Sequence, residues 1–207
     1  MSRAWPVKGI EPDGPLLENA RRVLQVRVAE FYSYTVTVPI ESAVTAHHDL
    51  RIATKRLRYT LEMFRSVFAP VGDRQIERTK TLQEVLGNLH DSDVRIKMIE
   101  DEVAAVAVEQ VGAVSRALAG APADDHVAIT TSALRPPPDD PRRGLYSLLG
   151  REYATRRQQY REFVDLWLSL ERDGMRSDLA RLSSLPVPAD RADAVELGSD
   201  DDAKPGR

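Results

Sequence analysis

The chain has 207 residues, 42% of them hydrophobic, so it can form one domain with a buried core and additional tails. A formal net charge of -3 argues against a protein that is basic overall, and the absence of cysteine excludes disulfides and thiolate metal sites. The sequence contains no apolar run of the roughly 20 residues that a membrane span needs, and residues 1–15 lack a signal-peptide core. We therefore expect a cytoplasmic protein.

Proline and glycine divide the chain into segments in which apolar residues recur at helical spacing, which predicts an all-α fold. The predicted long helices cover residues 15–36, 44–69, 73–117 and 143–173, and a short helix follows at 175–184. The β-branched alternation of residues 34–38 is interpreted as the end of the first helix, with a strand as the alternative. Four long amphipathic helices with short breaks predict an antiparallel bundle.

The predicted domain organisation has three parts. An N-terminal extension over residues 1–14 precedes a helical bundle over 15–185, and an acidic tail follows at 186–207. The segment 122–141 contains the run RPPPDDP, which predicts a long loop before the last long helix. The tail carries six acidic and three basic residues, which predicts disorder. It either only improves solubility or competes for a basic groove elsewhere in the chain.

The second predicted helix has one apolar and one cationic face. Its apolar face holds Leu50, Ala53, Leu57, Leu61, Phe64 and Phe68. On roughly the opposite side, four cationic residues fall within an arc of about 80° and cover about 15 Å of helix. These four residues, here named the cationic stripe, are His48, Arg51, Lys55 and Arg58. Because like charges at this spacing repel each other, the stripe is either a solvated surface or a site for an anion.

The last long helix is rich in arginine, with six between residues 142 and 161 against Glu152 alone. Arg156 falls in the middle of its inward, aromatic face. Because an unpaired buried charge is very costly, Arg156 needs a partner. That partner is either Glu152, one turn earlier, or a bound anion.

In the third predicted helix, one heptad phase of apolar residues continues through Gly87, where the lack of a side chain would let a neighbouring helix approach closely. At about 1.5 Å per residue this helix would reach about 65 Å, so it must kink, break or protrude. Asp91 and Asp93 lie in apolar surroundings. We expect them to pair with arginines of a facing helix; metal binding is the alternative.

Two motifs together resemble the signature of the CHAD family, the conserved histidine α-helical domain. The first is HHDLRIATKRLRYTLEMF at residues 47–64, and the second, some twenty residues later, is LQEVLGNLHDSDV. The matching positions are His48, Arg51, Lys55, Arg56 and Arg58, then Leu86, Gly87, Asp91, Asp93 and Val94. The resemblance is clear over residues 45–96.

This resemblance implies a helical bundle whose basic faces bind inorganic polyphosphate without catalysis, metal or cofactor. The candidate binding residues are His48, Arg51, Lys55, Arg56, Arg58, Lys80, Arg156 and Arg157, with Asp91 and Asp93 as supporting acids. It also implies a place in the cytoplasm, with polyphosphate granules as one location. Full-length members have two such bundles, whereas the signature occurs once here, so a homodimer is one way to complete the cavity.

Polyphosphate requires a line of Arg and Lys donors and no groups that read bases, and its binding should weaken with salt. Two alternatives remain open. One is a nucleic-acid or phosphoprotein adaptor that uses the same stripe, although only Tyr59 lies beside it for stacking. The other is an HD-type metal phosphohydrolase using His48, His90, Asp91 and Asp93. Against it, the adjacent pair of histidines lacks the i, i+4 spacing of two ligands on one helix.

Overall fold

A computed structural model of the protein describes residues 3–135 and 140–184. Within these residues, 82% are helical and none forms a strand, which confirms the all-α class. The α-helices are α1 Leu16–Tyr32, α2 Val44–Met63, α3 Arg65–Phe68, α4 Val71–Gly120, α5 His126–Ala133, α6 Pro141–Arg172 and α7 Met175–Ser183. Two short 3-10 helices are η1 Thr35–Thr37 and η2 Ala123–Asp125. The predicted disordered tail lies outside the described residues, as does its suggested contact with the groove.

Three predicted elements differ from the observed ones. The first helix ends at Tyr32, and the β-branched segment after it forms η1, so it is neither the helix end nor a strand. The range 44–69 is divided at Phe64, whose backbone angles leave the helical region. The predicted loop before the last long helix contains α5, because the stretch HVAITTSA has neither proline nor glycine to interrupt a helix.

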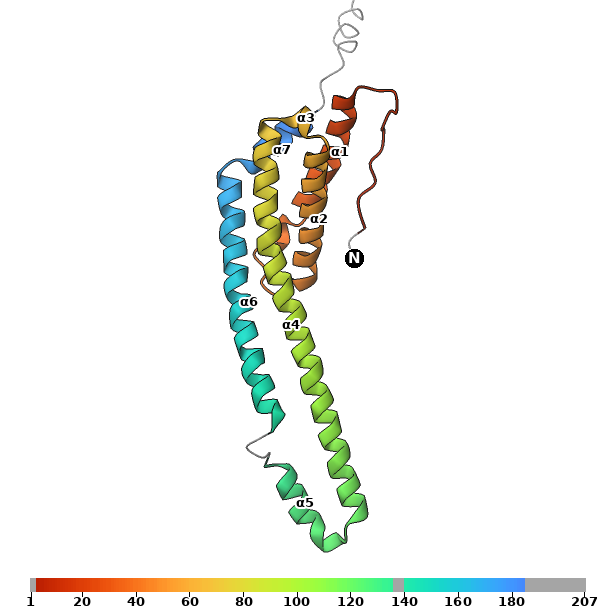
Figure 1. Ribbon diagram of the computed structural model, residues 1–207, viewed down its shortest axis with the longest axis vertical. Coiled ribbons are helices and arrows are strands. Elements are labelled where there is room, and N and C mark those ends of the chain that lie inside the picture. The colour runs from red at the N-terminus through yellow and green to blue at the C-terminus, as the bar shows by residue number, and fades with distance from the viewer. Residues whose placement is uncertain (1–2, 136–139, 185–207) are drawn as a thin grey trace, which may run out of the picture.

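The long helix α4 organises the molecule (Figure 1). It packs against both α2 and α6, while α1 packs against α2, and α7 contacts α1, α4 and α6. Beyond these neighbours α4 protrudes, with η2 and α5 folded back beside its end. Residues 101–135 and 140–152 form this protrusion, which we call the arm.

The core lies at the end of the molecule where α1, α2, α4, α6 and α7 meet. Its buried side chains include Leu24, Phe31, Leu57, Leu86, Phe163, Trp167 and Leu179. Leu50, Ala53, Leu57 and Leu61 are each at most 1% exposed, which confirms the predicted apolar face of α2. The cationic stripe of α2 therefore lies on the side away from the core.

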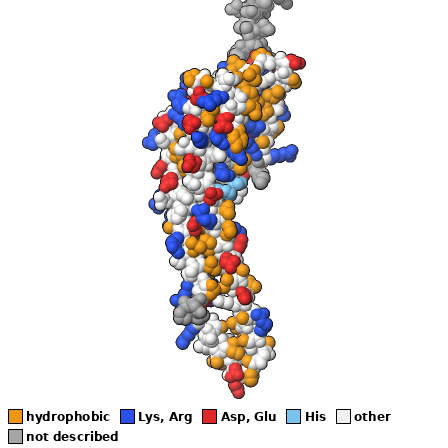
Figure 2. Space-filling model, viewed as in Figure 1, with side chains coloured by type: hydrophobic (Ala, Val, Ile, Leu, Met, Phe, Trp, Pro, Cys, Tyr) orange, Lys and Arg blue, Asp and Glu red, His pale blue; other side chains and the backbone are white. Residues whose placement is uncertain are grey.

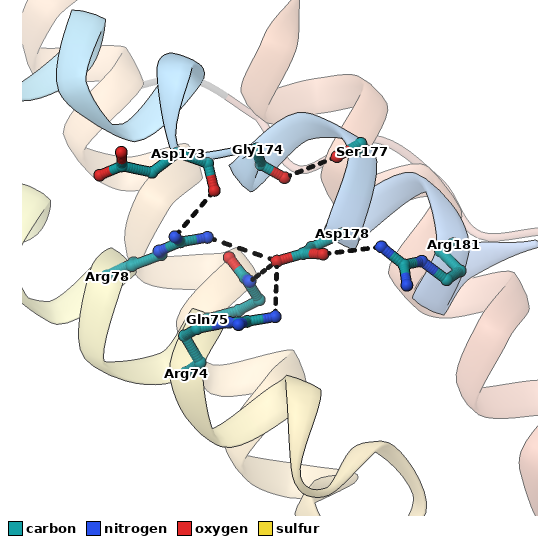
Figure 3. Close-up of polar contacts among 8 residues, drawn as sticks. All are labelled: Arg74, Gln75, Arg78, Asp173, Gly174, Ser177, Asp178 and Arg181. Atoms are coloured by element: carbon teal, nitrogen blue, oxygen red, sulfur yellow. Dashed lines mark hydrogen bonds and ion pairs between the residues drawn. The ribbon is translucent and has the colours of Figure 1, made fainter.

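A buried carboxylate attaches α7 to the start of α4 (Figure 3). Asp178 is 7% exposed and accepts hydrogen bonds from the side chains of Arg74, Gln75, Arg78 and Arg181. The turn before α7 uses Gly174 with φ 77°, a conformation that glycine adopts without strain. The position of α7 thus depends on one acidic side chain held by three arginines and an amide.

By length and composition, α4 is the one helix of the described part of the chain that could cross a membrane, and its apolar window is 0% buried. Core helices of proteins that never enter a membrane meet the same two criteria, so the finding itself assigns no location. What it does show is that an apolar stretch of α4 is left uncovered by the other described residues.

Candidate functional site

The cationic stripe of α2 lies directly beside α4. The Nδ1 atoms of His48 and His90 are 3.3 Å apart, and the two imidazole rings are separated by 4.4 Å between centroids. Three residues further along α2, the Nε atom of Arg51 lies 3.7 Å from where a Cβ of Gly87 would be. A Cβ at Gly87 would meet this guanidinium at an ordinary van der Waals distance, so this contact places Arg51 against α4 but does not itself require glycine.

These two contacts show that α2 and α4 run antiparallel, and they set Lys80 of α4 level with Arg58 of α2. On α4, the four residues Lys80, Gln83, Gly87 and His90 fall within an arc of about 80°. This face of α4 and the cationic stripe together form what we call the seam. Sequence analysis missed Gln83 and considered His90 only as a metal ligand. The four residues Lys80, Gln83, Gly87 and His90 follow one another at steps of three or four residues, as the four residues of the stripe do. This spacing is the signal that could have identified Gln83 and His90.

Several polar atoms in the seam are buried without a hydrogen-bond partner among the described residues. They are the Nε atoms of Arg51 and Arg58 and the Oε1 atom of Gln83. Native proteins satisfy nearly all buried polar groups, so such atoms require an explanation. Two N–H donors on one helix face, both belonging to permanent cations, are what an anionic ligand would use.

The other cations of the seam, Lys55 and Arg58 of the stripe and Lys80 of α4, form only weak contacts with the described residues. Arg58 donates to Glu62 at 3.3 Å, one turn along α2, and its guanidinium lies 4.8 Å from the ring centre of Tyr59. Lys55 is exposed and its Nζ lies 5.6 Å from the same ring centre. Lys80 is 3.9 Å from Glu77. Surface contacts of this kind are worth about 0–1 kcal/mol, so a stronger anionic ligand can displace them.

The seam lowers the pKa of His90 below its ordinary value. Burial is the main cause, followed by the positive charges of His48 and Arg51, while Asp91 and Asp93 act in the opposite direction. A bound anion would reverse the electrostatic part of this shift, because negative charge favours the protonated imidazole. Anion binding at the seam is therefore expected to be coupled to proton uptake.

Arg56 does not belong to this surface. It forms a 2.5 Å ion pair with Glu30 of α1, which also pairs with Arg27 and is 1% exposed. Because Glu30 is buried, Arg56 holds α1 against α2. Although Arg56 matches the family motif, it lies on a different side of α2 from the cationic stripe.

The partners of Arg156 lie outside its own helix. Its Nε donates to Asp93 of α4 at 2.5 Å, and it also donates to the backbone carbonyl of Glu41 at 3.1 Å. Glu152, one of the two alternatives from the sequence, instead accepts from Arg95, so that alternative is wrong. The expected pairing of Asp93 with an arginine of a facing helix is confirmed.

Arg156 and Arg157 line a cleft of about 790 Å³ at the histidine end of the seam. The lining also includes Ile40, Glu41, Lys97 and Tyr153, so the charges in the cleft are mixed. Arg157 is exposed and forms no ion pair within the described residues. The structure therefore places these two arginines next to the seam and not in it.

The other supporting acid, Asp91, is exposed and pairs with no arginine of the described chain, contrary to expectation.

The HD-type alternative would need a metal site that includes His48, His90, Asp91 and Asp93. In the part of the chain that the structure describes, no group of three or more His, Cys, Asp or Glu side chains is arranged to hold a metal ion. His47, next to the stripe, faces the core and is 2% exposed.

Comparison with known proteins agrees with the two sequence motifs. Residues 3–100 match the family model described as CHAD domain, and no curated protein or solved structure matches the chain. The matched range contains α1, α2, α3 and the first part of α4, and with them the whole seam. Residues 3–100, just under half of the chain, are therefore the part that matches the CHAD domain family.

Proposed function

We propose that this protein binds inorganic polyphosphate along the seam and does not catalyse its cleavage. CHAD domains are linked in general to polyphosphate binding. The observation that carries the proposal is the cationic stripe, in which Arg51 and Arg58 each keep a buried Nε without a partner. We further propose a cytoplasmic location, at polyphosphate granules, where the ligand is concentrated.

The shape of the stripe favours a linear polyanion over a single phosphate. Its four cations cover about 15 Å of α2, so one phosphate could reach only part of the stripe. A chain with one negative charge per unit can contact all of them in turn. Arginine adds planar, two-pronged recognition of phosphate oxygens, and lysine adds a compact charge.

Acidic side chains limit where such a polyanion can lie. Glu77, Glu84 and Asp91 of α4 are exposed and follow one another at seven-residue intervals along the outer edge of the seam. A polyanion is repelled by this row and attracted by α2. It is therefore confined to the α2 side, between the cationic stripe and Lys80.

The test is a titration with long-chain polyphosphate at two salt concentrations. The combined variant Arg51→Gln, Lys55→Gln and Arg58→Gln should bind at least about tenfold more weakly and show a shallower salt dependence, because counterion release scales with the phosphates contacted. Its matched control removes three exposed arginines of α6: Arg143→Gln, Arg161→Gln and Arg172→Gln. Equal losses in both folded variants, or no loss in either, would refute the stripe as the site.

One observation supports a second candidate, a nucleic-acid adaptor. Tyr59 is 47% exposed and lies between Lys55 and Arg58, so it offers one stacking face beside two cations. Competition between polyphosphate and single-stranded RNA at matched charge and salt distinguishes the two functions. Displacement of polyphosphate by equimolar RNA, lost in Tyr59→Ala, would favour the adaptor.

A further inference from the structure

Beyond the end of α2, the face of α4 that carries the seam continues without a neighbour among the described elements. Its apolar and small residues fall within an arc of about 80°. We call this the outer face, and it consists of Val94, Met98, Ala105, Val108, Gly112 and Ala119. The same arc also contains one charged residue, Asp101, which pairs with Lys97 one turn earlier. Ser92 lies on about the opposite side of the helix and bonds Gln159 of α6, so the outer face points away from α6. Figure 1 shows no other element along this side of the arm.

Apart from Asp101, the outer face is more apolar than a solvated helix surface. Met98 is 66% exposed and Val108 is 72% exposed, and the valine next to this face, Val111, is 67% exposed. Hydrophobic side chains are visible along the arm in Figure 2. A helix exposed to water on its outer side normally has polar residues there, and contiguous apolar patches mark interaction sites.

Two unpaired charges lie along one edge of the outer face. Glu109 and Arg116 are both exposed, and neither has an ion pair or hydrogen bond within the described residues. Seven positions separate them, about 10 Å along the helix, so they cannot pair with each other. Their midpoint falls between Gly112 and Ala113.

These positions are self-complementary under a two-fold axis. If two α4 helices cross antiparallel at that midpoint, Glu109 of each copy lies opposite Arg116 of the other, as a symmetric interface requires. Gly112 at the crossing lets the backbones approach. The atom nearest to where its Cβ would be is Nη1 of Arg116, at 3.4 Å, and this belongs to the end of a flexible side chain.

We propose that two copies of this protein associate through antiparallel contact between their outer faces, centred between Gly112 and Ala113. A membrane fits this surface less well. Between residues 101 and 120 the charges are Asp101, Glu102 and Glu109 against Arg116, and this negative balance is repelled by anionic lipids. The inference does not depend on what the seam binds.

The test measures the mass of the full chain by sedimentation equilibrium over a range of concentrations. Glu109→Arg replaces two ion pairs by two like-charge contacts and should weaken dimerisation by about tenfold or more, and Arg116→Glu should do the same. The double variant that exchanges the two charges should restore the dimer. Arg161→Glu, a charge reversal on an exposed part of α6, is the matched control and should leave the mass unchanged.

Gly112→Leu provides a test that does not depend on charge. Inside one copy the Cβ of the new side chain meets only the end of the flexible Arg116 side chain, so the helix should still form, as circular dichroism will check. At the crossing point it would separate the helices and abolish the dimer. A monomer at all concentrations, a dimer unaffected by these changes, or capture of the chain by lipid vesicles in place of a dimer would overturn the proposal.

Discussion

At the residue scale, the adjacent histidines His47 and His48 lie in different environments, because one position along a helix turns the side chain by about 100°. His48 lies in the seam, whereas His47 is buried in the core. Its Nε2 lies 3.3 Å from the carbonyl oxygen of Thr37, and its ring packs against Tyr160 and Phe163. Burial lowers the pKa of His47 below its ordinary value, and the charge of Arg156 adds to this, whereas the Thr37 carbonyl and Asp93 act in the opposite direction. His47 is therefore neutral in the folded protein at neutral pH.

A dependence of stability on pH follows from His47. Because its pKa is lower in the folded than in the unfolded chain, its contribution to the free energy of unfolding is present above about pH 6.5 and is lost as the pH falls through the folded pKa. We expect urea unfolding to show a smaller decrease in stability between neutral and mildly acidic pH for His47→Phe than for the wild type. His126→Gln, in the arm, serves as the control. An unchanged pH profile in His47→Phe would contradict the assignment.

At the element scale, the edge of α4 is expected to limit the affinity of the seam for polyanions. Glu84 is exposed, lies in the acidic row beside the seam and forms no ion pair within the described residues. Glu84→Gln removes a repulsive charge and should raise polyphosphate affinity by about two- to threefold at low salt, with less gain at high salt. Asp165→Asn, which removes an exposed acid of α6, should leave the affinity unchanged. A similar gain in both variants would indicate a general charge effect.

At the scale of the whole molecule, the Asp178 cluster fixes α7 against the rest of the fold. Asp178→Asn keeps the size of the side chain but leaves Arg74, Arg78 and Arg181 without their shared carboxylate. Since Arg74 and Arg181 are largely exposed, we expect a loss of about 2 kcal/mol in the free energy of unfolding, measured with urea. Asp173→Asn, at an exposed neighbouring position, should cost much less. Equal costs would show that the cluster does not stabilise the fold.

Much of the fold follows from periodicity in the sequence. Leu50, Leu57 and Leu61 recur at helical spacing and are buried in the structure, so the cationic stripe opposite them could be located without coordinates. Short elements were harder to predict. The segment of η1 combines residues that favour strands with a local 3-10 turn, and α5 is too short for a periodic pattern to distinguish it from a loop.

The site could be predicted only in part, because a helical wheel reports on one helix at a time. The wheel indicates that Arg156 lies on an inward face. It can show possible partners only on the same helix, whereas the observed partner Asp93 is 63 positions away in the sequence. For the same reason, the sequence alone could not separate Arg56, which is held by Glu30, from the four residues of the stripe.

By itself, the sequence determined the all-α class, the buried face of α2, the cationic stripe and the motifs of the CHAD family. All of these depend on residue types at fixed spacings along the chain. The tertiary structure alone decided the partners of Arg156, the antiparallel register that joins His48 to His90, and the uncovered outer face of α4. Contacts between helices depend on how the cores pack in space, and local spacing carries no information about which distant segments that packing brings together.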